Sequence, residues 1–334
     1  MGKIIAKRLV MLVLVVFGVT FITFLLSHII PGDPARMMVG QRASEETLNA
    51  VRRQLALDQP VWVQYELYLR GLLHGDLGTS IRTQQPVARD LMTFFPATVE
   101  LAIVAFIFAI LLGIPLGVLS AVKKDRAWDH GGRVFAIAGV SIPVFWSGLV
   151  VILIFYGYLG WFPSTGRLDI NLHPPTHITG LYLVDSLLSG DYVAFRNSLW
   201  HLLLPAAVLS YAQLAIVMRQ VRASMLEVLG QEYIRTAKAN GISGISLLFR
   251  YALRNALIPT VTVIGLSFGS LLGGAVVTET VFSWPGMGKY VVDSISNLDF
   301  PAIMGFTLVI SFGYVVINLL VDIMYYYLDP QIKE

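Results

Sequence analysis

The sequence has no cysteine among its 334 residues and carries little charge. Without thiols the chain forms no disulfide, no thiolate metal site and no cysteine nucleophile. Only 13% of the residues are charged, whereas 56% are hydrophobic and the mean hydropathy is +0.70. Soluble domains carry about 25% charged residues. The composition therefore predicts an integral membrane protein.

Motifs for common enzyme chemistry are also missing. The six histidines show no zinc-protease spacing, and the two that are four residues apart, His173 and His177, have two prolines between them that exclude a helix. Residues Gly286 to Lys289 superficially resemble a phosphate-binding loop, but Tyr290 stands where Ser or Thr is required. We therefore expect no catalytic residue, no metal and no cofactor bound by this chain.

The basic residues do not form a nucleic-acid-binding stripe. The net charge is +3 and the isoelectric point is near 9.0, but Lys and Arg are spread among the short segments between apolar runs. We therefore expect no nucleic-acid partner and explain the positive charge by membrane topology.

Six apolar runs are long enough to cross the roughly 30 Å hydrocarbon core of a bilayer as helices. They are Leu9 to Ile30, Ala97 to Val122, Val134 to Gly160, Leu199 to Met218, Leu257 to Val277 and Pro301 to Leu328. An even number of spans places both ends of the chain on one side. That side carries 14 of the 24 Lys and Arg residues, although its segments are about half as long as those opposite. Both termini are therefore predicted to be cytoplasmic.

The opposite side is predicted to carry a helical insertion at residues 31–95. Leu48 and Val51 mark one amphipathic helix that has Ser44 as its N-cap, and a second begins near Pro60. The segment Trp161 to Ser198 has no helical period, so we expect an irregular lid or docking surface there. We expect one membrane domain over residues 1–334.

The cytoplasmic segment at residues 219–256 is far longer than topology requires. Helix-forming residues run from Glu232 to Asn240, Gly241 supplies a left-handed residue that ends a helix, and Ser243 starts a second one. This pattern predicts a docking surface. The alternative is a solvated connector held by phospholipid headgroups.

Glycines and carboxylates within the spans have two interpretations each. Gly265, Gly269 and Gly273 lie on one helix face, where they permit either static helix packing or sliding along a pathway. Glu100 and Glu279 lie near the outer ends of their spans, where a carboxylate is either interfacial or faces a substrate.

The segment from Glu232 to Pro259 resembles the EAA loop of ABC importer permeases, in which a short cytoplasmic helix sits in a cleft of the ATPase subunit. The sequence has Arg-Thr-Ala at residues 235–237 where the generic motif has Glu-Ala-Ala, and Gly241 follows at the expected spacing. Pro259 lies farther downstream than in the generic pattern. These departures resemble the peptide branch of the superfamily, whose permeases commonly read like YIRTAKANG followed by ALRNALIP.

Other motifs along nearly the whole chain are similar to those of dipeptide and oligopeptide importer permeases. They are IIPGDPAR, HGDLGTSI, FPATVEL, SMLEVLGQEYIRTA and TETVFSWPGMG. Within that branch, HPPTHITGLYLVDSLL and SFGYVVINLLVDIMYYYLDP look most like permeases of D-alanyl-D-alanine importers.

The resemblance implies the all-α type I ABC importer permease fold, with six transmembrane helices, in the bacterial inner membrane. It implies a homologous second permease, two ATPase subunits that bind ATP and Mg²⁺, and a periplasmic substrate-binding protein that delivers a peptide. Membrane lipid is a further expected partner. A bulky residue at Gly241 or Ala237 is expected to uncouple transport.

The resemblance also implies site residues in three groups. The ATPase-docking group comprises Glu232, Arg235, Thr236, Ala237, Ala239, Asn240 and Gly241. The pathway or helix-packing group comprises Gly265, Gly269, Gly273 and Glu279. The group expected to contact the binding protein comprises Asp76, Arg82 and Trp284.

Alternatives remain open at this point. Nickel and glutathione permeases share the same motifs. A secondary transporter driven by an ion gradient is expected to have more midplane carboxylates or pairs of broken helices. An intramembrane enzyme requires a clustered nucleophile and base, which the sequence does not show.

Overall fold

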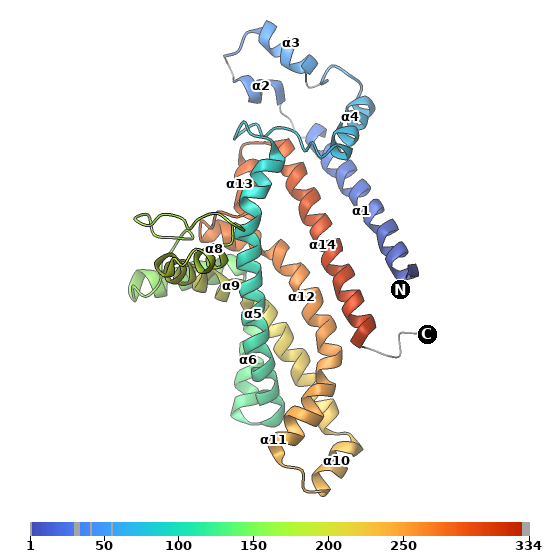
Figure 1. Ribbon diagram of the computed structural model, residues 1–334, viewed down its shortest axis with the longest axis vertical. Helices are drawn as coiled ribbons and strands as arrows, with labels where there is room; N and C mark the ends of the chain where they lie inside the picture. The colour runs from blue at the N-terminus through green and yellow to red at the C-terminus, as the bar shows by residue number, and fades with distance from the viewer. Residues whose placement is uncertain (1, 30–33, 41, 55, 329–334) are drawn as a thin grey trace. The chain divides into compact units, whose positions relative to one another are not determined.

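The computed structural model describes residues 2–29, 34–40, 42–54 and 56–328, and their regular structure is helical (Figure 1). Besides the helices, these residues contain one isolated β-bridge, between Thr79 and Pro86. The chain divides into two compact units. One combines Met1–Pro96 with Gly286–Val315, and the other combines Ala97–Pro285 with Val316–Glu334. We call them the first unit and the span unit.

The first unit begins with α1 (Gly2–Ile29) and three short helices, α2 (Pro34–Val39), α3 (Glu45–Gln54) and α4 (Val61–Leu73). It also contains the start of α5 (Val87–Val122), α13 (Met287–Ser296) and the start of α14 (Phe300–Leu328). The two helices predicted after Ser44 and Pro60 are confirmed as α3 and α4, and the Ser44 hydroxyl accepts a hydrogen bond from the Thr47 N–H at 3.2 Å.

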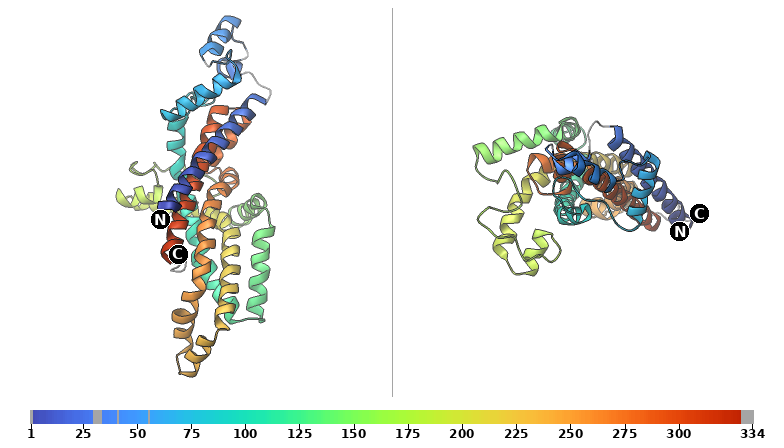
Figure 2. Two further views of the ribbon diagram at one scale, coloured as in Figure 1. Left: turned by 90° about the vertical axis from the view of Figure 1, so that its right-hand side faces the viewer. Right: turned by 90° about the horizontal axis from the view of Figure 1, so that it is seen from above.

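The span unit contains the rest of α5, then α6 (Ala127–Ser141), α7 (Val144–Ile152) and the π-helical η1 (Leu153–Tyr158). The short α8 (Tyr182–Leu188) precedes α9 (Tyr192–Leu229). After α9 come α10 (Glu232–Ala239), α11 (Gly244–Ser246), the π-helical η2 (Leu247–Leu253) and α12 (Arg254–Val281). Two perpendicular views show α9 and α12 side by side, with α6 against α9 (Figure 2).

Four helices of the described residues are long and apolar enough to cross a membrane, and the number rises to six if each of two bent helix pairs is one span. The predicted third span is one of the bent pairs: α6 and α7 meet at 107°. Ile142 between them is extended, at φ −81° and ψ 126°, because the ring of Pro143 disfavours a helical conformation in the preceding residue. The predicted span over Val134 to Gly160 is therefore broken in the middle, and it counts as one of six spans if the bent pair is a single span.

The segment Trp161 to Ser198 is less irregular than predicted. Residues 182–188 form α8, and α9 begins at Tyr192 rather than at Leu199. Asp191 caps α9, since its side chain accepts a hydrogen bond from the Ala194 N–H at 2.9 Å. The hydrophobic pattern does not reveal this start because the first turns of α9 contain the polar pair Arg196 and Asn197.

The two largest apolar clusters of the span unit lie at different levels of its helices. One joins the middle of α5 to α9 and to the second half of α12, and includes Leu101, Leu202 and Leu271. The other joins the end of α5 to the end of α9, to α10 and to the start of α12, and includes Val221 and Ile234. Because α10 shares this second cluster, the segment at residues 219–256 is packed against the spans.

Candidate functional site

The helix α10 lies at one end of the α9–α12 pair, and α8 lies at the opposite end (Figure 1). The helix α10 ends in a Schellman motif. The Gly241 N–H donates to the Lys238 carbonyl at 3.1 Å, and the Ile242 N–H donates to the Ala237 carbonyl at 3.3 Å. Gly241 has φ +75°, which confirms that it is the left-handed residue ending the helix. A Cβ at Gly241 meets no atom within 4 Å, so backbone conformation and not space limits this position.

One face of α10 is buried and the other is free. Ile234 and Ala237 are 4% and 7% exposed, and Ile234 is a member of the second apolar cluster. The other six predicted docking residues are exposed: Glu232, Arg235, Thr236, Ala239, Asn240 and Gly241. The expectation for Ala237 is corrected, because a bulky side chain there disturbs the chain's own packing before it meets any partner.

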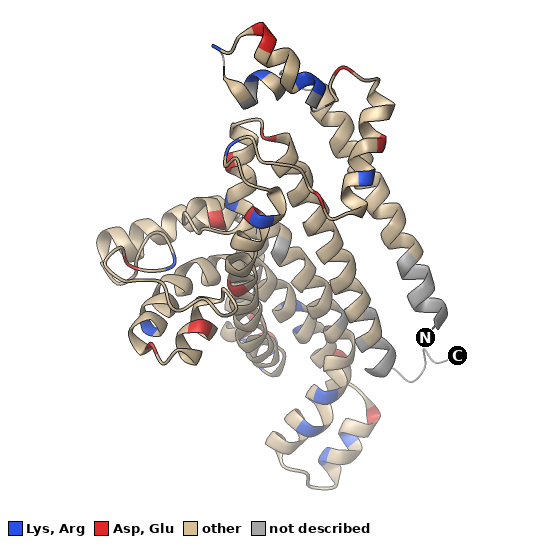
Figure 3. Ribbon diagram, turned by 45° about the horizontal axis from the view of Figure 1, so that its top comes forward, with Lys and Arg blue, Asp and Glu red and all other residues tan. Residues whose placement is uncertain are grey.

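The exposed face of α10 is basic. Arg235 pairs with Glu232 at 2.8 Å, Lys238 is exposed on the same helix, and Arg250 and Arg254 are exposed in η2 and at the start of α12. Figure 3 shows Lys and Arg on the helices at this end of the span unit. Ser243 caps the second helix as predicted, its hydroxyl accepting from the Ser246 N–H at 3.4 Å. That helix continues through η2 into α12 without an intervening loop. Residues 240–243 separate it from α10, and the helix bends by 46° between Val261 and Val263.

An ion pair that the sequence did not reveal fixes the α5–α6 turn to α9. The fully buried Asp129 accepts hydrogen bonds from Arg222 Nε at 2.6 Å and Nη2 at 2.7 Å, from the Ser120 hydroxyl at 2.5 Å and from the Asp125 N–H at 3.0 Å. Arg222 lies two turns before the end of α9. We call this cluster the Asp129 clamp. It gives the helix leading into α10 a rigid attachment.

Replacing Asp129 with Ala is expected to lower the free energy of unfolding by about 3 kcal/mol, because it leaves the largely buried Arg222 guanidinium without its partner. Thermal unfolding of the purified chain measures the effect. The double variant Asp129→Ala with Arg222→Met is the control and is expected to regain most of the loss. An equally unstable double variant contradicts the ion-pair explanation.

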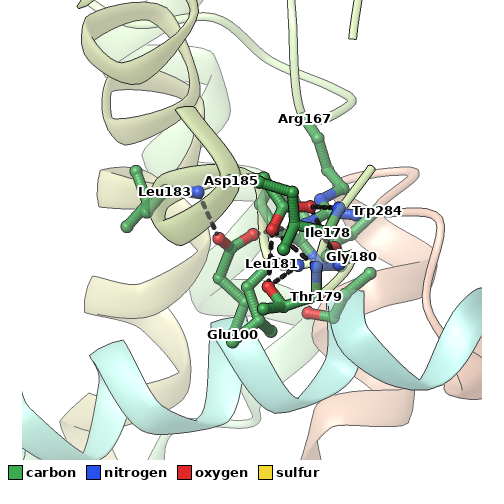
Figure 4. A network of polar contacts seen from close by, with 10 residues as sticks. Glu100, Arg167, Ile178, Thr179, Gly180, Leu181, Leu183, Asp185 and Trp284 are labelled. Atoms are coloured by element: carbon green, nitrogen blue, oxygen red, sulfur yellow. Dashed lines mark hydrogen bonds and ion pairs between the residues drawn. The ribbon is translucent and has the colours of Figure 1, made fainter. Parts of the chain in front are cut away.

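A second polar network joins α5 to the residues before and within α8 (Figure 4). Arg167, which is 8% exposed, donates to Glu100 Oε2 at 2.6 Å and to the Gly180 carbonyl at 3.1 Å. Glu100 Oε1 accepts from the Leu183 N–H at 2.8 Å. The Arg167 guanidinium carbon also lies 3.6 Å from the centre of the Tyr182 ring. Glu100 therefore anchors the segment at residues 161–198 to α5. Its carboxylate lies in a buried ion pair with Arg167.

Asp185 organises the turn that precedes α8. Its carboxylate accepts from the backbone N–H groups of Ile178, Thr179 and Gly180 and from the Thr179 hydroxyl, at 2.7 to 3.3 Å. Burial favours a higher pKa for Asp185, but these hydrogen bonds outweigh burial and hold the pKa below its usual range. The spacing of Asp185 after a Thr-Gly turn is a signal that a search for capping carboxylates would detect.

The lowered pKa of Asp185 predicts an acid-sensitive turn. Its contribution to stability is fully present above the unfolded pKa of about 3.9 and is lost as the pH falls through the lower folded pKa. Cleavage of residues 161–198 by an acid-active protease is expected to accelerate below about pH 4. The variant Asp185→Asn is expected to be more easily cleaved at pH 7 and to show a smaller acceleration in acid. Equal pH profiles for the two proteins contradict this role.

The predicted pathway residues have different surroundings. Gly265 packs against Val321, since an added Cβ falls 2.5 Å from Val321 Cγ2, and Gly269 is buried. Gly273 is exposed, and a Cβ there meets nothing within 4 Å. Glu279 is fully buried and accepts from the Thr98 hydroxyl at 2.6 Å. These contacts favour helix packing for Gly265 and Glu279.

Of the three residues expected to contact a binding protein, two are exposed. Asp76 accepts from the Gly78 N–H at 2.8 Å, and the Arg82 guanidinium carbon lies 5.4 Å from the centre of the Tyr290 ring. Trp284 is only 1% exposed, and its Nε1–H donates to the Ala97 carbonyl at 2.9 Å. The expectation for Trp284 is corrected, because its indole is a core side chain that a partner does not reach.

Known proteins match the chain from end to end. The family described as "Binding-protein-dependent transport system inner membrane component" matches residues 113–334, and its N-terminal companion family matches residues 1–102. The chain is 56% identical to the probable D,D-dipeptide transport system permease protein of Escherichia coli K12, over 99% of this chain and 97% of that protein. It is 44% identical to the dipeptide transport system permease protein of Alkalihalophilus pseudofirmus, over 98% of each chain.

A more distant relative is the glutathione transport system permease protein of Escherichia coli O6:H1, which is 36% identical over 98% of this chain and 97% of its own length. The relatives therefore cover the exposed α10, the Asp129 clamp and the network around Glu100 and Arg167 alike. Together with the all-helical, multi-span structure, these matches show that the chain belongs to the inner-membrane permease family of binding-protein-dependent ABC importers.

Proposed function

We propose that this chain forms one half of the translocation pathway of an ATP-driven importer for dipeptides or short oligopeptides, with D,D-dipeptides such as D-alanyl-D-alanine as the narrower substrate class. The observation that carries the proposal is the 56% identity to the probable D,D-dipeptide permease over 99% of this chain. Other relatives at 41 to 46% identity are named dipeptide or di/tripeptide permeases.

Such an importer needs a complete pathway, ATP hydrolysis and delivery of the peptide, and the proposed partners supply these. A homologous permease supplies the other half of the pathway, two cytoplasmic ATPase subunits bind ATP and Mg²⁺, and a periplasmic protein delivers the peptide. The exposed docking residues of α10 receive one ATPase subunit. Asp76 and Arg82 remain the proposed contacts with the binding protein, since both are exposed.

Both termini are proposed to lie in the cytoplasm, with α10 on the same side. In support, the α5–α6 turn and α10 share one end of the span unit, through the second apolar cluster and the Asp129 clamp. The turn contributes Lys123, Lys124 and Arg126, and basic residues favour the cytoplasmic side of a membrane.

The proposed mechanism is alternating access driven through α10. When ATP draws the ATPase subunits together, the seated α10 helices move with them. α11, η2 and α12 follow one another without a loop, although the run bends by 46° between Val261 and Val263. Because α9 is tied to the α5–α6 turn by the Asp129 clamp, these helices are proposed to move together. The pathway then opens alternately to the two sides of the membrane.

Glutathione is the second candidate substrate, because a permease named for glutathione transport is 36% identical over nearly the whole chain. Glutathione and a dipeptide share an amide backbone and a terminal carboxylate. The lower identity makes it the weaker candidate. Nickel remains an alternative within the same family, although the described residues contain no group of three or more metal-ligating side chains.

Reconstitution of the assembled importer in proteoliposomes tests the function. We expect ATP-dependent uptake that requires the binding protein, and greater stimulation of ATP hydrolysis by D-alanyl-D-alanine than by L-alanyl-L-alanine, glutathione or Ni²⁺. An ionophore is expected to leave uptake unchanged. Uptake that collapses with the ionophore and survives removal of ATP contradicts the proposal and favours a secondary transporter.

A further inference from the structure

An apolar groove lies between α5, α6 and α9, close to the α5–α6 turn. Its volume is about 460 Å³, within the range of about 300–1,000 Å³ that is usual for ligand sites. The lining includes Leu116, Leu119, Trp128, Gly131, Phe135 and Met218. The groove therefore offers hydrocarbon contacts and no side-chain hydrogen-bonding group except the Trp128 indole.

Two adjacent glycines of α6 define the shape of the groove. A Cβ added at Gly131 meets no atom within 4 Å, whereas a Cβ at Gly132 falls 2.5 Å from Met218 Cε. Gly132 thus lets α6 approach α9, and Gly131 leaves the floor of the groove open. Trp128 at the edge is 67% exposed, so the groove is accessible from outside the helix bundle.

The rim of the groove is basic. Lys123, Lys124 and Arg126 occupy the turn before α6, and the exposed Arg133 directly follows Gly132. The acidic residues of the same stretch are Asp125 and Asp129. The carboxylate of Asp129 is buried and bound by Arg222, and it also lies 3.9 Å from Arg133, so among the described residues of the rim the unpaired positive charge is that of Lys123, Lys124 and Arg126. Positive charge therefore dominates the water-facing end of an otherwise apolar groove.

This combination matches one kind of molecule. A phospholipid joins an acyl chain to a phosphate, and basic pockets between spanning helices on the cytoplasmic side attract anionic headgroups. Tryptophan side chains favour the level of the lipid headgroups. Trp128 lies in the first turn of α6, directly after the basic turn. A protein partner also covers apolar surface, but it does not explain the excess of basic side chains at one end of the groove.

We propose that this groove is a binding site for an anionic phospholipid of the surrounding bilayer, with an acyl chain over Gly131 and the phosphate at Lys124 and Arg126. The site lies beside the Asp129 clamp and the end of α5, which packs with α10. A lipid seated there braces the turn to which α9 is attached.

The test uses the assembled importer, reconstituted with equal amounts of phosphatidylglycerol and phosphatidylcholine, extracted in detergent and analysed for retained lipid by mass spectrometry. The wild type is expected to retain phosphatidylglycerol preferentially. Gly131→Phe fills the groove and is expected to lower the retained amount about tenfold, the factor for loss of burial of about two methylene groups. Lys124→Gln with Arg126→Gln is expected to abolish the preference while leaving some lipid bound.

Two controls separate groove occupancy from damage to the fold. Gly157→Phe places the same side chain at an exposed glycine of η1, where the nearest atom outside its neighbours is 3.8 Å from an added Cβ. Gly131→Ala improves helix propensity and leaves the groove largely open. Both variants are expected to retain lipid as the wild type does. Unchanged lipid retention in Gly131→Phe overturns the proposal. If that variant also loses the second permease, the groove binds a protein and not a lipid.

Discussion

Replacing Ala239 with Trp is expected to abolish uptake while the chain still inserts and assembles with its second permease. Ala239 is exposed at the end of α10 and lies outside the apolar cluster that holds this helix. A large side chain there prevents the close approach that small residues permit. Loss of a central contact of this kind weakens subunit association about thirtyfold or more. Co-purification of the ATPase subunit and binding-protein-stimulated uptake measure the effect.

The matched control for Ala239 is Ile245→Trp, at an exposed apolar position in the adjacent α11. If α10 alone enters the ATPase cleft, the control variant keeps most of its ATPase association. Thr236→Trp, one turn earlier on the exposed side of α10, is expected to fail as Ala239→Trp does. Normal association and uptake in both α10 variants contradicts docking through this helix.

Replacing Glu100 with Ala is expected to lower the free energy of unfolding by about 3–5 kcal/mol, the usual result of removing one member of a buried ion pair. The side chains of Glu100 and Arg167 are 5% and 7% exposed, so water does not compensate the remaining guanidinium. The Leu183 N–H loses its acceptor at the same time. Thermal unfolding of the purified chain and protease cleavage of residues 161–198 measure the two consequences.

Glu100→Gln provides the graded control for this second prediction. Its amide oxygen still accepts one hydrogen bond, from Arg167 or from Leu183, so we expect an intermediate loss of stability. The double variant Glu100→Ala with Arg167→Met removes the unpaired charge and is expected to be more stable than Glu100→Ala alone. If Glu100→Ala is as stable as the wild type, the ion pair between Glu100 and Arg167 does not anchor residues 161–198.

Most of the span arrangement follows from the sequence, because long apolar runs leave little freedom in a bilayer. The end of α10 was also predictable, since Gly241 supplies the left-handed conformation that a Schellman motif requires. The 107° bend between α6 and α7 had a signal in Pro143, but proline in an apolar run is compatible with either a kink or a full break. Only the packing of α7 against α9 and α12 selects the break.

The polar networks were less predictable, because their members are far apart in the sequence. Arg222 lies 93 residues after Asp129, and Arg167 lies 67 residues after Glu100. A single sequence shows that such charges are costly in an apolar setting but does not show which of them pair. The burial of Trp284 was hard to predict for the same reason. Its position between two helices indicates exposure, but its indole N–H binds the carbonyl of the distant Ala97 and its ring packs in the first apolar cluster.

The central claim is that energy enters this chain from an ATPase subunit through α10. The absence of cysteine from the chain allows a direct measurement with a single introduced thiol. Ala239→Cys, labelled with a thiol-attached photo-crosslinker in the assembled importer, is expected to give a covalent product with the ATPase subunit. Labelling of Ile170→Cys, an exposed position within residues 161–198, is expected to give no such product. Cross-linking of the ATPase subunit from residue 170, or its absence from residue 239 in an importer that retains transport, contradicts the account.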